Sequence, residues 1–333
     1  FKRKPMSNYH IKHLEEYYQV YRKSVREPEN FWEEIAEEHF MWQRKWNKVL
    51  SWDFSKPEVK WFEGAQSNIT ENCIDRHLAT RGEKTAILFE PNDPSEESEY
   101  ITYNQLHARV NQFANVLKEQ GIKKGDRVCI YLPMIPELAI SVLACARIGA
   151  IHSVVFAGFS ATALSTRIND SDCKMVITSD GSYRGAKTID LKGIVDEALE
   201  DCSCIETVLV AKRIQTNINM KSGRDKWLQP LLDNASAICE AEIMNAEDPL
   251  FILYTSGSTG NPMKALIHPL HWVIEQAVIF RHWSWGGYHF RDATAMLRSY
   301  SPKEGEPLTK YSRPLNTTYF SPFHLTDENM MMY

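Results

Sequence analysis

The sequence has no apolar run long enough to cross a membrane as a helix, which needs about 18 or more consecutive apolar residues. Residues 1–5 are basic, but polar residues follow them, so this end lacks the apolar core of a secretory signal. We therefore expect a cytoplasmic protein without a membrane partner.

The patterns of cysteine and of positive charge also give no indication of a zinc-binding protein or of a nucleic-acid-binding protein. The seven cysteines form no Cys-x-x-Cys pair and no zinc-like spacing with histidine, so we expect reduced core thiols and no metal ligands. The net charge is −5 and no basic stripe is present, which gives no reason to expect a nucleic-acid partner. No internal repeat or low-complexity tract is evident. With 43% hydrophobic and 24% charged residues, the composition is that of an ordinary globular protein.

What is present is a regular alternation of short apolar runs and amphipathic stretches. This alternation predicts an α/β fold built from βαβ units around a mostly parallel sheet. A helical segment, in which Pro28 indicates a helix start, precedes it. The expected strands are 86–89, 128–132, 151–156, 175–178, 207–210 and 251–254, and the expected helices are 103–120, 136–148, 160–169 and 190–200. Ligands of such sheets bind at the carboxyl ends of the strands.

The last expected strand opens directly into a run of small residues. Phe251 to Tyr254 are apolar or aromatic, and six small, hydroxylic or glycine residues follow: Thr255, Ser256, Gly257, Ser258, Thr259 and Gly260. Backbone N–H groups of such a loop can turn towards an anion, and the hydroxyls can donate beside them. The pattern differs from the Walker loop, because Asn261 and Pro262 follow Gly260. We predict a site for the polyphosphate of a nucleotide; the alternative is a flexible surface turn.

A second candidate anion site follows the strand that ends at Thr178. Arg184 and Lys187 are three residues apart on a glycine-containing loop, and such a pair can clamp a phosphate. Spacing alone is weak support, because exposed arginine and lysine side chains are usually only solvated. We interpret His152, at the start of a strand, as a hydrogen-bonded core histidine. The acidic pairs Asp196/Glu197 and Glu200/Asp201 read as a solvated helix face.

The sequence resembles the adenylate-forming acyl-CoA synthetases, and among them the acetyl-coenzyme A synthetases. The resemblance rests on Tyr254 to Gly260 with Pro262 and Lys264 behind it, and on segments 68–77, 124–128, 144–156 and 246–250. It runs almost continuously from about residue 9 to residue 268. It implies that the α/β part is the N-terminal portion of that family's large domain. It also implies ATP, CoA and Mg²⁺ as cofactors, and acetate, ATP and CoA as small-molecule substrates.

The resemblance also assigns residues to sites. It places the ATP phosphates on Thr255 to Gly260, with Lys264 as the loop's lysine if Met263 is one inserted residue. It places the 3′-phosphate of CoA on the loop residues Arg184, Gly185, Ala186 and Lys187. The residues beside the pantetheine arm are Phe156, Ala157 and Gly158, where Ala157 replaces a family glycine. It assigns no catalytic residue.

The resemblance predicts three parts: residues 1–75, helical or irregular; 76–268, the partial adenylate-forming domain; and 269–333, an unmatched tail. A frameshift, a chimera or mis-assigned residues would produce such a tail. The family's C-terminal half does not appear in the sequence. The leading hypothesis is an acetate–CoA ligase that works through acetyl-AMP. The alternatives are a non-catalytic CoA- or nucleotide-binding fragment, or a ligase for another small carboxylate such as propionate or acetoacetate.

Overall fold

The structure is a computed structural model that describes most of the chain up to Thr255 and four short strands beyond it. The described residues are 11, 13–53, 55–93, 95–185, 187–255, 263–267, 294–297, 309–312 and 317–320. Contacts between Cα atoms divide the chain into two compact units, Phe1–Pro269 and Leu270–Tyr333. In the second unit, β14 (Thr294–Leu297), β16 (Thr317–Phe320) and β15 (Thr309–Ser312) form a sheet in that order.

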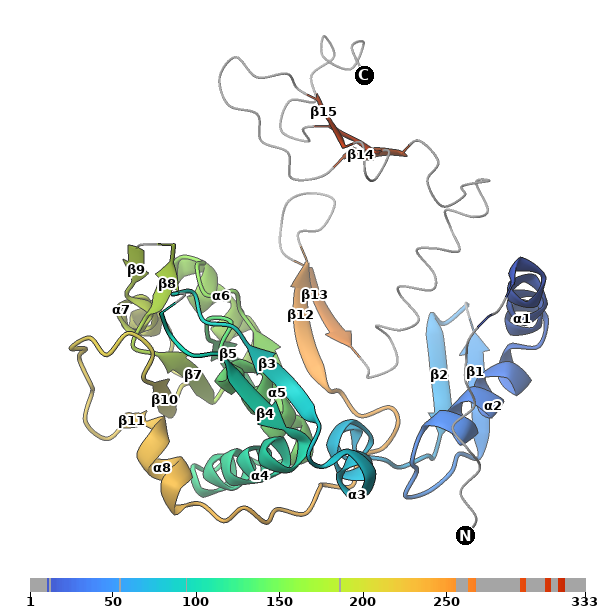
Figure 1. The fold of residues 1–333 in the computed structure, drawn as a ribbon, viewed down its shortest axis with the longest axis horizontal. Helices are drawn as coiled ribbons and strands as arrows, with labels where there is room; N and C mark the ends of the chain where they lie inside the picture. The colour runs from blue at the N-terminus through green and yellow to red at the C-terminus, as the bar shows by residue number, and fades with distance from the viewer. Residues whose placement is uncertain are drawn as a thin grey trace. The chain divides into compact units, whose positions relative to one another are not determined.

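The first unit begins with two helices and an antiparallel hairpin (Figure 1). Helix α1 (Leu14–Arg26) starts where the His13 side chain accepts a hydrogen bond from the backbone N–H of Glu16. Helix α2 (Pro28–His39) has proline in its first turn, a position that needs no backbone donor. Strands β1 (Lys48–Asp53) and β2 (Glu58–Glu63) then pair with each other. The predicted helical segment is therefore confirmed, and it ends in a hairpin.

A parallel sheet forms the centre of the first unit. Its strand order is β11-β10-β7-β5-β6-β12-β13, and every neighbouring pair is parallel except β12 with β13. The bounds are β5 (Arg127–Tyr131), β6 (Ile151–Val154), β7 (Met175–Ser179), β10 (Thr207–Ala211), β11 (Asp225–Trp227), β12 (Phe251–Thr255) and β13 (Met263–Ile267). A separate antiparallel pair is made by β3 (Thr85–Phe89) and β4 (Glu99–Thr102). The α/β fold expected from the sequence is confirmed.

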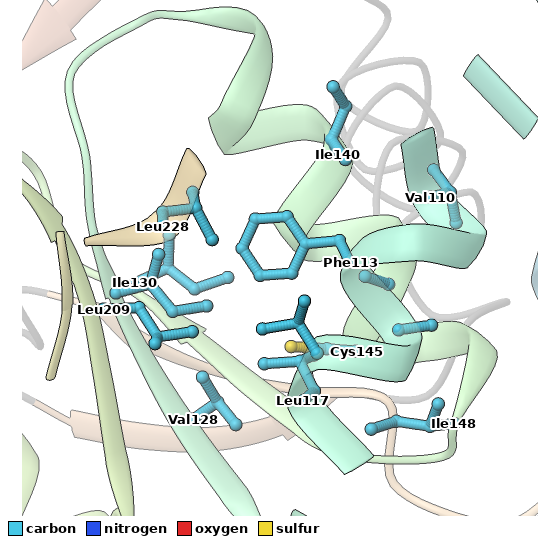
Figure 2. Packing of buried hydrophobic residues seen from close by; sticks show 14 of the residues in the cluster. Val110, Phe113, Leu117, Val128, Ile130, Ile140, Cys145, Ile148, Leu209 and Leu228 are labelled. Atoms are coloured by element: carbon cyan, nitrogen blue, oxygen red, sulfur yellow. The ribbon is translucent and has the colours of Figure 1, made fainter. Parts of the chain in front are cut away.

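Helices cover both faces of this sheet, and the side chains of β5 alternate between two cores. Val128 and Ile130 pack with α4 (Tyr103–Glu119), α5 (Pro136–Arg147) and α8 (Leu228–Asn234). Figure 2 shows Phe113 and Leu117 of α4 packed in this core. Cys129 and Tyr131 pack on the other face with α6 (Ala161–Ser171) and α7 (Leu191–Ala198). A continuous apolar strand is what burial on both faces requires.

Buried polar contacts join the start of the α/β part to its later segments. The Arg147 guanidinium is 4% exposed and makes a two-point ion pair with Asp75, with N–O distances of 2.9 and 3.0 Å. The same guanidinium donates to the backbone carbonyl of Cys239 at 2.8 Å. The Asn68 amide, also buried, donates to the carbonyls of Ala146 and Glu242. These contacts position the segment before α3 (Arg76–Arg81) against the sheet.

One part of the helix face expected to be solvated is an ion-pair network. The Lys192 ammonium, only 1% exposed, lies 2.6 Å from Asp196 and 2.8 Å from Asp225. Arg224 binds both carboxylates, at 2.6 Å to Asp196 and 2.5 Å to Asp225. The interpretation of Asp196 as simply solvated was therefore wrong. Its partner Lys192 lies on the same helix but is buried. Burial of this lysine could not be expected from the sequence, because lysine side chains are usually exposed.

His152 is buried as expected, and its environment has a measurable consequence. Its ring stacks on Phe251 with centroids 5.5 Å apart, and its Nδ1 has no hydrogen-bond partner among the described residues. The expected hydrogen bond at that atom is therefore not seen in the described part of the chain. Burial lowers the pKa of His152 from its ordinary 6.5 to about 4.

We expect this histidine to make the protein less stable as the pH falls from 6.5 towards 4. The unfolded chain binds a proton at His152 in this window and the folded chain does not, so acid favours unfolding. With each pKa unit equivalent to 1.36 kcal/mol, the loss should reach about 2–3 kcal/mol at pH 4. Urea unfolding of the parent and of His152→Gln at pH 7 and pH 4.5 measures it. An equal pH dependence in both proteins would contradict this assignment.

Candidate functional site

A cavity of about 390 Å³ opens beyond the carboxyl ends of β5 and β6. Its lining comes from five separate segments of the chain, including Phe89 at the end of β3, Met134 after β5, Phe156 after β6, and Arg213 after β10. Met134 is 80% exposed and Phe156 is 67% exposed, although both are large apolar side chains. An apolar rim with a few convergent polar groups is typical of a small-molecule site.

A buried tyrosine of β5 forms a hydrogen bond with the turn after β6. Tyr131, fully buried at the end of β5, donates its hydroxyl to the backbone carbonyl of Phe159 at 2.8 Å. The N–H of Gly158 closes the turn on the carbonyl of Phe156 at 2.8 Å. A side chain at Gly158 would meet the Phe156 ring at 2.9 Å. Phe156, Ala157 and Gly158, the residues expected beside the pantetheine arm, all line the cavity.

The segment expected to hold a phosphate is a short antiparallel hairpin rather than an irregular loop. Strand β8 (Ser182–Arg184) pairs with β9 (Lys187–Ile189), and Arg184 lies opposite Lys187 in the register. Gly185 has φ of +61°, which the turn requires and glycine adopts without strain. Ala186 lies outside the described residues. Directly opposed residues have side chains on the same face of a hairpin, so the two cations are neighbours.

Both cations of this hairpin are exposed, and Arg184 also lines the cavity. Among the described residues, no carboxylate forms an ion pair with Arg184 or Lys187. Two neighbouring positive charges repel each other, so an anion bound between them is favoured. The geometry therefore brings Phe156, Ala157, Gly158 and Arg184 together at one cavity, and Lys187 lies opposite Arg184 on the hairpin.

The glycine-rich loop can be placed only at its two ends. Thr255 ends β12, and Met263 begins β13 and pairs with Thr255 in an antiparallel register. Lys264 lies on β13, opposite Tyr254 of β12, so it belongs to a strand and not to the loop itself. Ser256, Gly257, Ser258, Thr259 and Gly260 lie outside the described residues. Their assignment to ATP phosphates stays a prediction.

A tyrosine near the end of β12 contacts helix α6. The Tyr254 hydroxyl lies 2.6 Å from an Asp170 carboxylate oxygen and 2.8 Å from the Ser171 hydroxyl. The Arg167 guanidinium lies over the Tyr254 ring at 5.3 Å and over the Phe159 ring at 4.8 Å. Burial and the hydrogen bond with Asp170 raise the pKa of Tyr254 well above its ordinary value, so it stays a neutral donor. No motif in the sequence indicated this arrangement.

None of the described helices is both long and apolar enough to span a bilayer. Within the same part of the chain, no three His, Cys, Asp or Glu side chains gather as a metal site.

Family models cover most of the chain. One for AMP-binding enzymes matches residues 74–290, and one for the acetyl-coenzyme A synthetase N-terminus matches residues 17–73. The first match extends beyond residue 268, where we expected the resemblance to end. The chain therefore belongs to the family of AMP-binding enzymes, as the resemblance in its sequence predicted.

Individual relatives narrow the similarity within that family. The chain is 52% identical over 254 residues to an acetyl-coenzyme A synthetase of Magnetococcus marinus, covering 76% of this chain and 39% of the relative. It is 53% identical over 246 residues to one of Alkalilimnicola ehrlichii, covering 74% and 38% respectively. It thus spans less than half the length of these curated relatives.

A solved structure agrees with the fold. Acetoacetyl-CoA synthetase from Streptomyces lividans superposes with a TM-score of 0.69 at 26% sequence identity. The superposition covers 84% of this chain and 41% of that chain.

Proposed function

We propose that this chain is the CoA-binding front portion of an AMP-forming acetate–CoA ligase. One observation carries the proposal: Arg184 and Lys187 face each other on a hairpin beside the cavity that Phe156, Ala157 and Gly158 line. Arginine supplies a planar fork and lysine a point charge, a combination suited to a phosphate monoester. The apolar rim at Met134 and Phe156 suits the adenine and pantetheine parts of CoA.

The reaction has two steps, and this chain's residues act by positioning. An acetate oxygen attacks the α-phosphorus of ATP, and the bond to the β-phosphate oxygen breaks, so pyrophosphate leaves with that electron pair. The thiolate of CoA then attacks the carbonyl of acetyl-AMP and AMP leaves. ATP enters as its Mg²⁺ complex, and Thr255 to Gly260 with Lys264 would bind its phosphates. The cavity would direct the CoA thiol towards that loop.

A second candidate function is binding of CoA without turnover. The cavity and the cation hairpin both belong to the unit Phe1–Pro269. Another short carboxylate, such as propionate or acetoacetate, would leave the CoA site unchanged. The parts 1–75, 76–268 and 269–333, the cytoplasmic location and the choice of acetate remain proposals.

Acetate-dependent exchange of labelled pyrophosphate into ATP tests the ligase directly, because it reports the adenylation step alone. Calorimetric titration with CoA on the same full chain tests the binding site. Exchange together with CoA binding is the result expected for a ligase. CoA binding without exchange would leave the binding function, and loss of both in a cooperatively unfolding preparation would overturn the proposal.

A further inference from the structure

Arg213 lines the same cavity, although no motif in the sequence around it indicated a functional role. It follows β10, and its guanidinium lines the cavity together with Arg184. Unlike Arg184, it is largely buried, with 17% of its side chain exposed, and its charge is neutralised by Glu96 at 2.9 Å. A guanidinium that is already paired is better suited to hold protein groups than to hold a ligand.

Three segments meet at this guanidinium. Its central carbon lies 4.9 Å from the centre of the Tyr183 ring on β8 and 5.8 Å from that of Phe89 at the end of β3. Glu96 comes from the acidic loop between β3 and β4. Arg213 therefore joins the hairpin to a loop that lies about a hundred residues earlier in the sequence.

The acidic loop makes a second contact with the hairpin, at its turn. The Asn92 amide donates to the backbone carbonyl of Gly185 at 3.1 Å. Gly185 is the residue that follows Arg184, so this contact holds the turn between the two cations. The loop thus touches the hairpin at Gly185 directly and at Tyr183 through Arg213.

The backbone of Arg213 is fixed as firmly as its side chain. The fully buried Asp180 carboxylate accepts hydrogen bonds from the N–H groups of Arg213 at 2.7 Å, Ile214 at 3.1 Å and Gln215 at 2.7 Å. Asp180 also lies two residues before the hairpin, which begins at Ser182. One carboxylate therefore sets the relative positions of the hairpin's first strand and the arginine that packs on it.

We propose that Arg213 is a positioning residue that orders the Arg184–Lys187 pair and so sets the preference for a 3′-phosphorylated nucleotide such as CoA. The inference rests on the CoA-binding function proposed above. Arginine suits the task because its planar group can stack on two rings and bind a carboxylate at the same time, which a lysine ammonium cannot do. Residues that act through one another are not additive, and this property separates positioning from direct contact.

The test compares CoA with dephospho-CoA, which lacks the 3′-phosphate, by calorimetric titration of the full chain. The quantity measured is the ratio of the dephospho-CoA dissociation constant to that of CoA. Arg213→Ala should lower this ratio about tenfold, since a charge-assisted contact at the phosphate would be lost. Arg213→Lys, which keeps the charge but not the planar stack, should lower it by a similar amount. Lys212→Ala is the matched control, because the neighbouring Lys212 packs over Trp227 at 5.0 Å and lines no part of the cavity.

A double-variant background completes the design. In a chain that carries Arg184→Ala and Lys187→Ala, Arg213→Ala should leave the ratio unchanged, because nothing remains to be positioned. A further fall there would show that Arg213 itself binds the phosphate, and would overturn the positioning role. An unchanged ratio after Arg213→Ala in the parent would overturn it as well. If the parent shows no preference for CoA at all, the proposed function fails rather than this inference.

Discussion

Arg184→Ala is expected to weaken CoA binding about ten- to a hundredfold, the range for a lost charge-assisted hydrogen bond to a phosphate. Dephospho-CoA should bind almost as well as it does to the parent, because it offers Arg184 no phosphate. The expectation follows from the register of the hairpin, which places Arg184 opposite Lys187. Since both are exposed and no described carboxylate pairs with either, little protein structure depends on them.

Titration calorimetry with both ligands measures this effect. Arg22→Ala is the control for the change in net charge, because Arg22 is half-exposed on α1 and pairs only weakly with Glu15, at 3.4 Å. The thermal midpoint should be the same in all three proteins. Equal weakening of the two ligands would show that Arg184 does not bind the 3′-phosphate.

Asp225→Ala is expected to destabilise the fold by about 3–5 kcal/mol, the usual loss when one partner of a buried ion pair is removed. Asp225 is fully buried and Lys192 is 1% exposed, so the substitution leaves an ammonium and the Arg224 guanidinium with one carboxylate fewer. Asp225 also accepts the backbone N–H of Lys221 at 2.8 Å, and this contact is lost too.

Urea unfolding at pH 7 measures the loss, and Glu34→Ala supplies the comparison. The Glu34 carboxylate pairs with Lys23 at 2.5 Å, but 62% of its side chain is exposed. Exposed pairs contribute about 0–1 kcal/mol, so this variant should hardly differ from the parent. If the two variants lose similar stability, the Lys192 network does not support the fold.

The same network adds a pH dependence. Burial alone would raise the pKa of Asp225, but hydrogen bonds from Arg224 and Lys192 outweigh it and hold that pKa below its ordinary value of 3.8. The contribution to stability is therefore complete above that ordinary value and is lost as the pH falls through the lower, folded-state pKa.

The sequence predicts the parallel sheet well because strands such as Val128 to Leu132 are apolar throughout, and only burial on both faces favours that pattern. The hairpin β8–β9 was not predicted as strands. Its strands are three residues long and mostly polar, so they carry no periodicity that could be recognised. What forms it is tertiary: Arg213 packs on Tyr183, and Asn92 holds Gly185.

Only part of the candidate site could be predicted from the sequence. Arg184 and Lys187 were found through their resemblance to a family segment, since an arginine and a lysine three residues apart are common on any surface. Arg213 and Glu96 could not be found in this way, because their roles arise from contacts between segments that are distant in the sequence. Such contacts are a property of the folded chain and leave no local pattern.

Strand β12 joins the parallel sheet through only two residue pairs, Phe251 with His152 and Ile252 with Ser153, whereas it pairs with β13 along its whole length. In the sequence, the glycine-rich loop therefore follows the end of β12 that pairs with β13 but not with β6. The Tyr254 hydroxyl, bonded to Asp170, therefore holds the part of β12 beyond Ile252 against helix α6, where β6 no longer pairs with it.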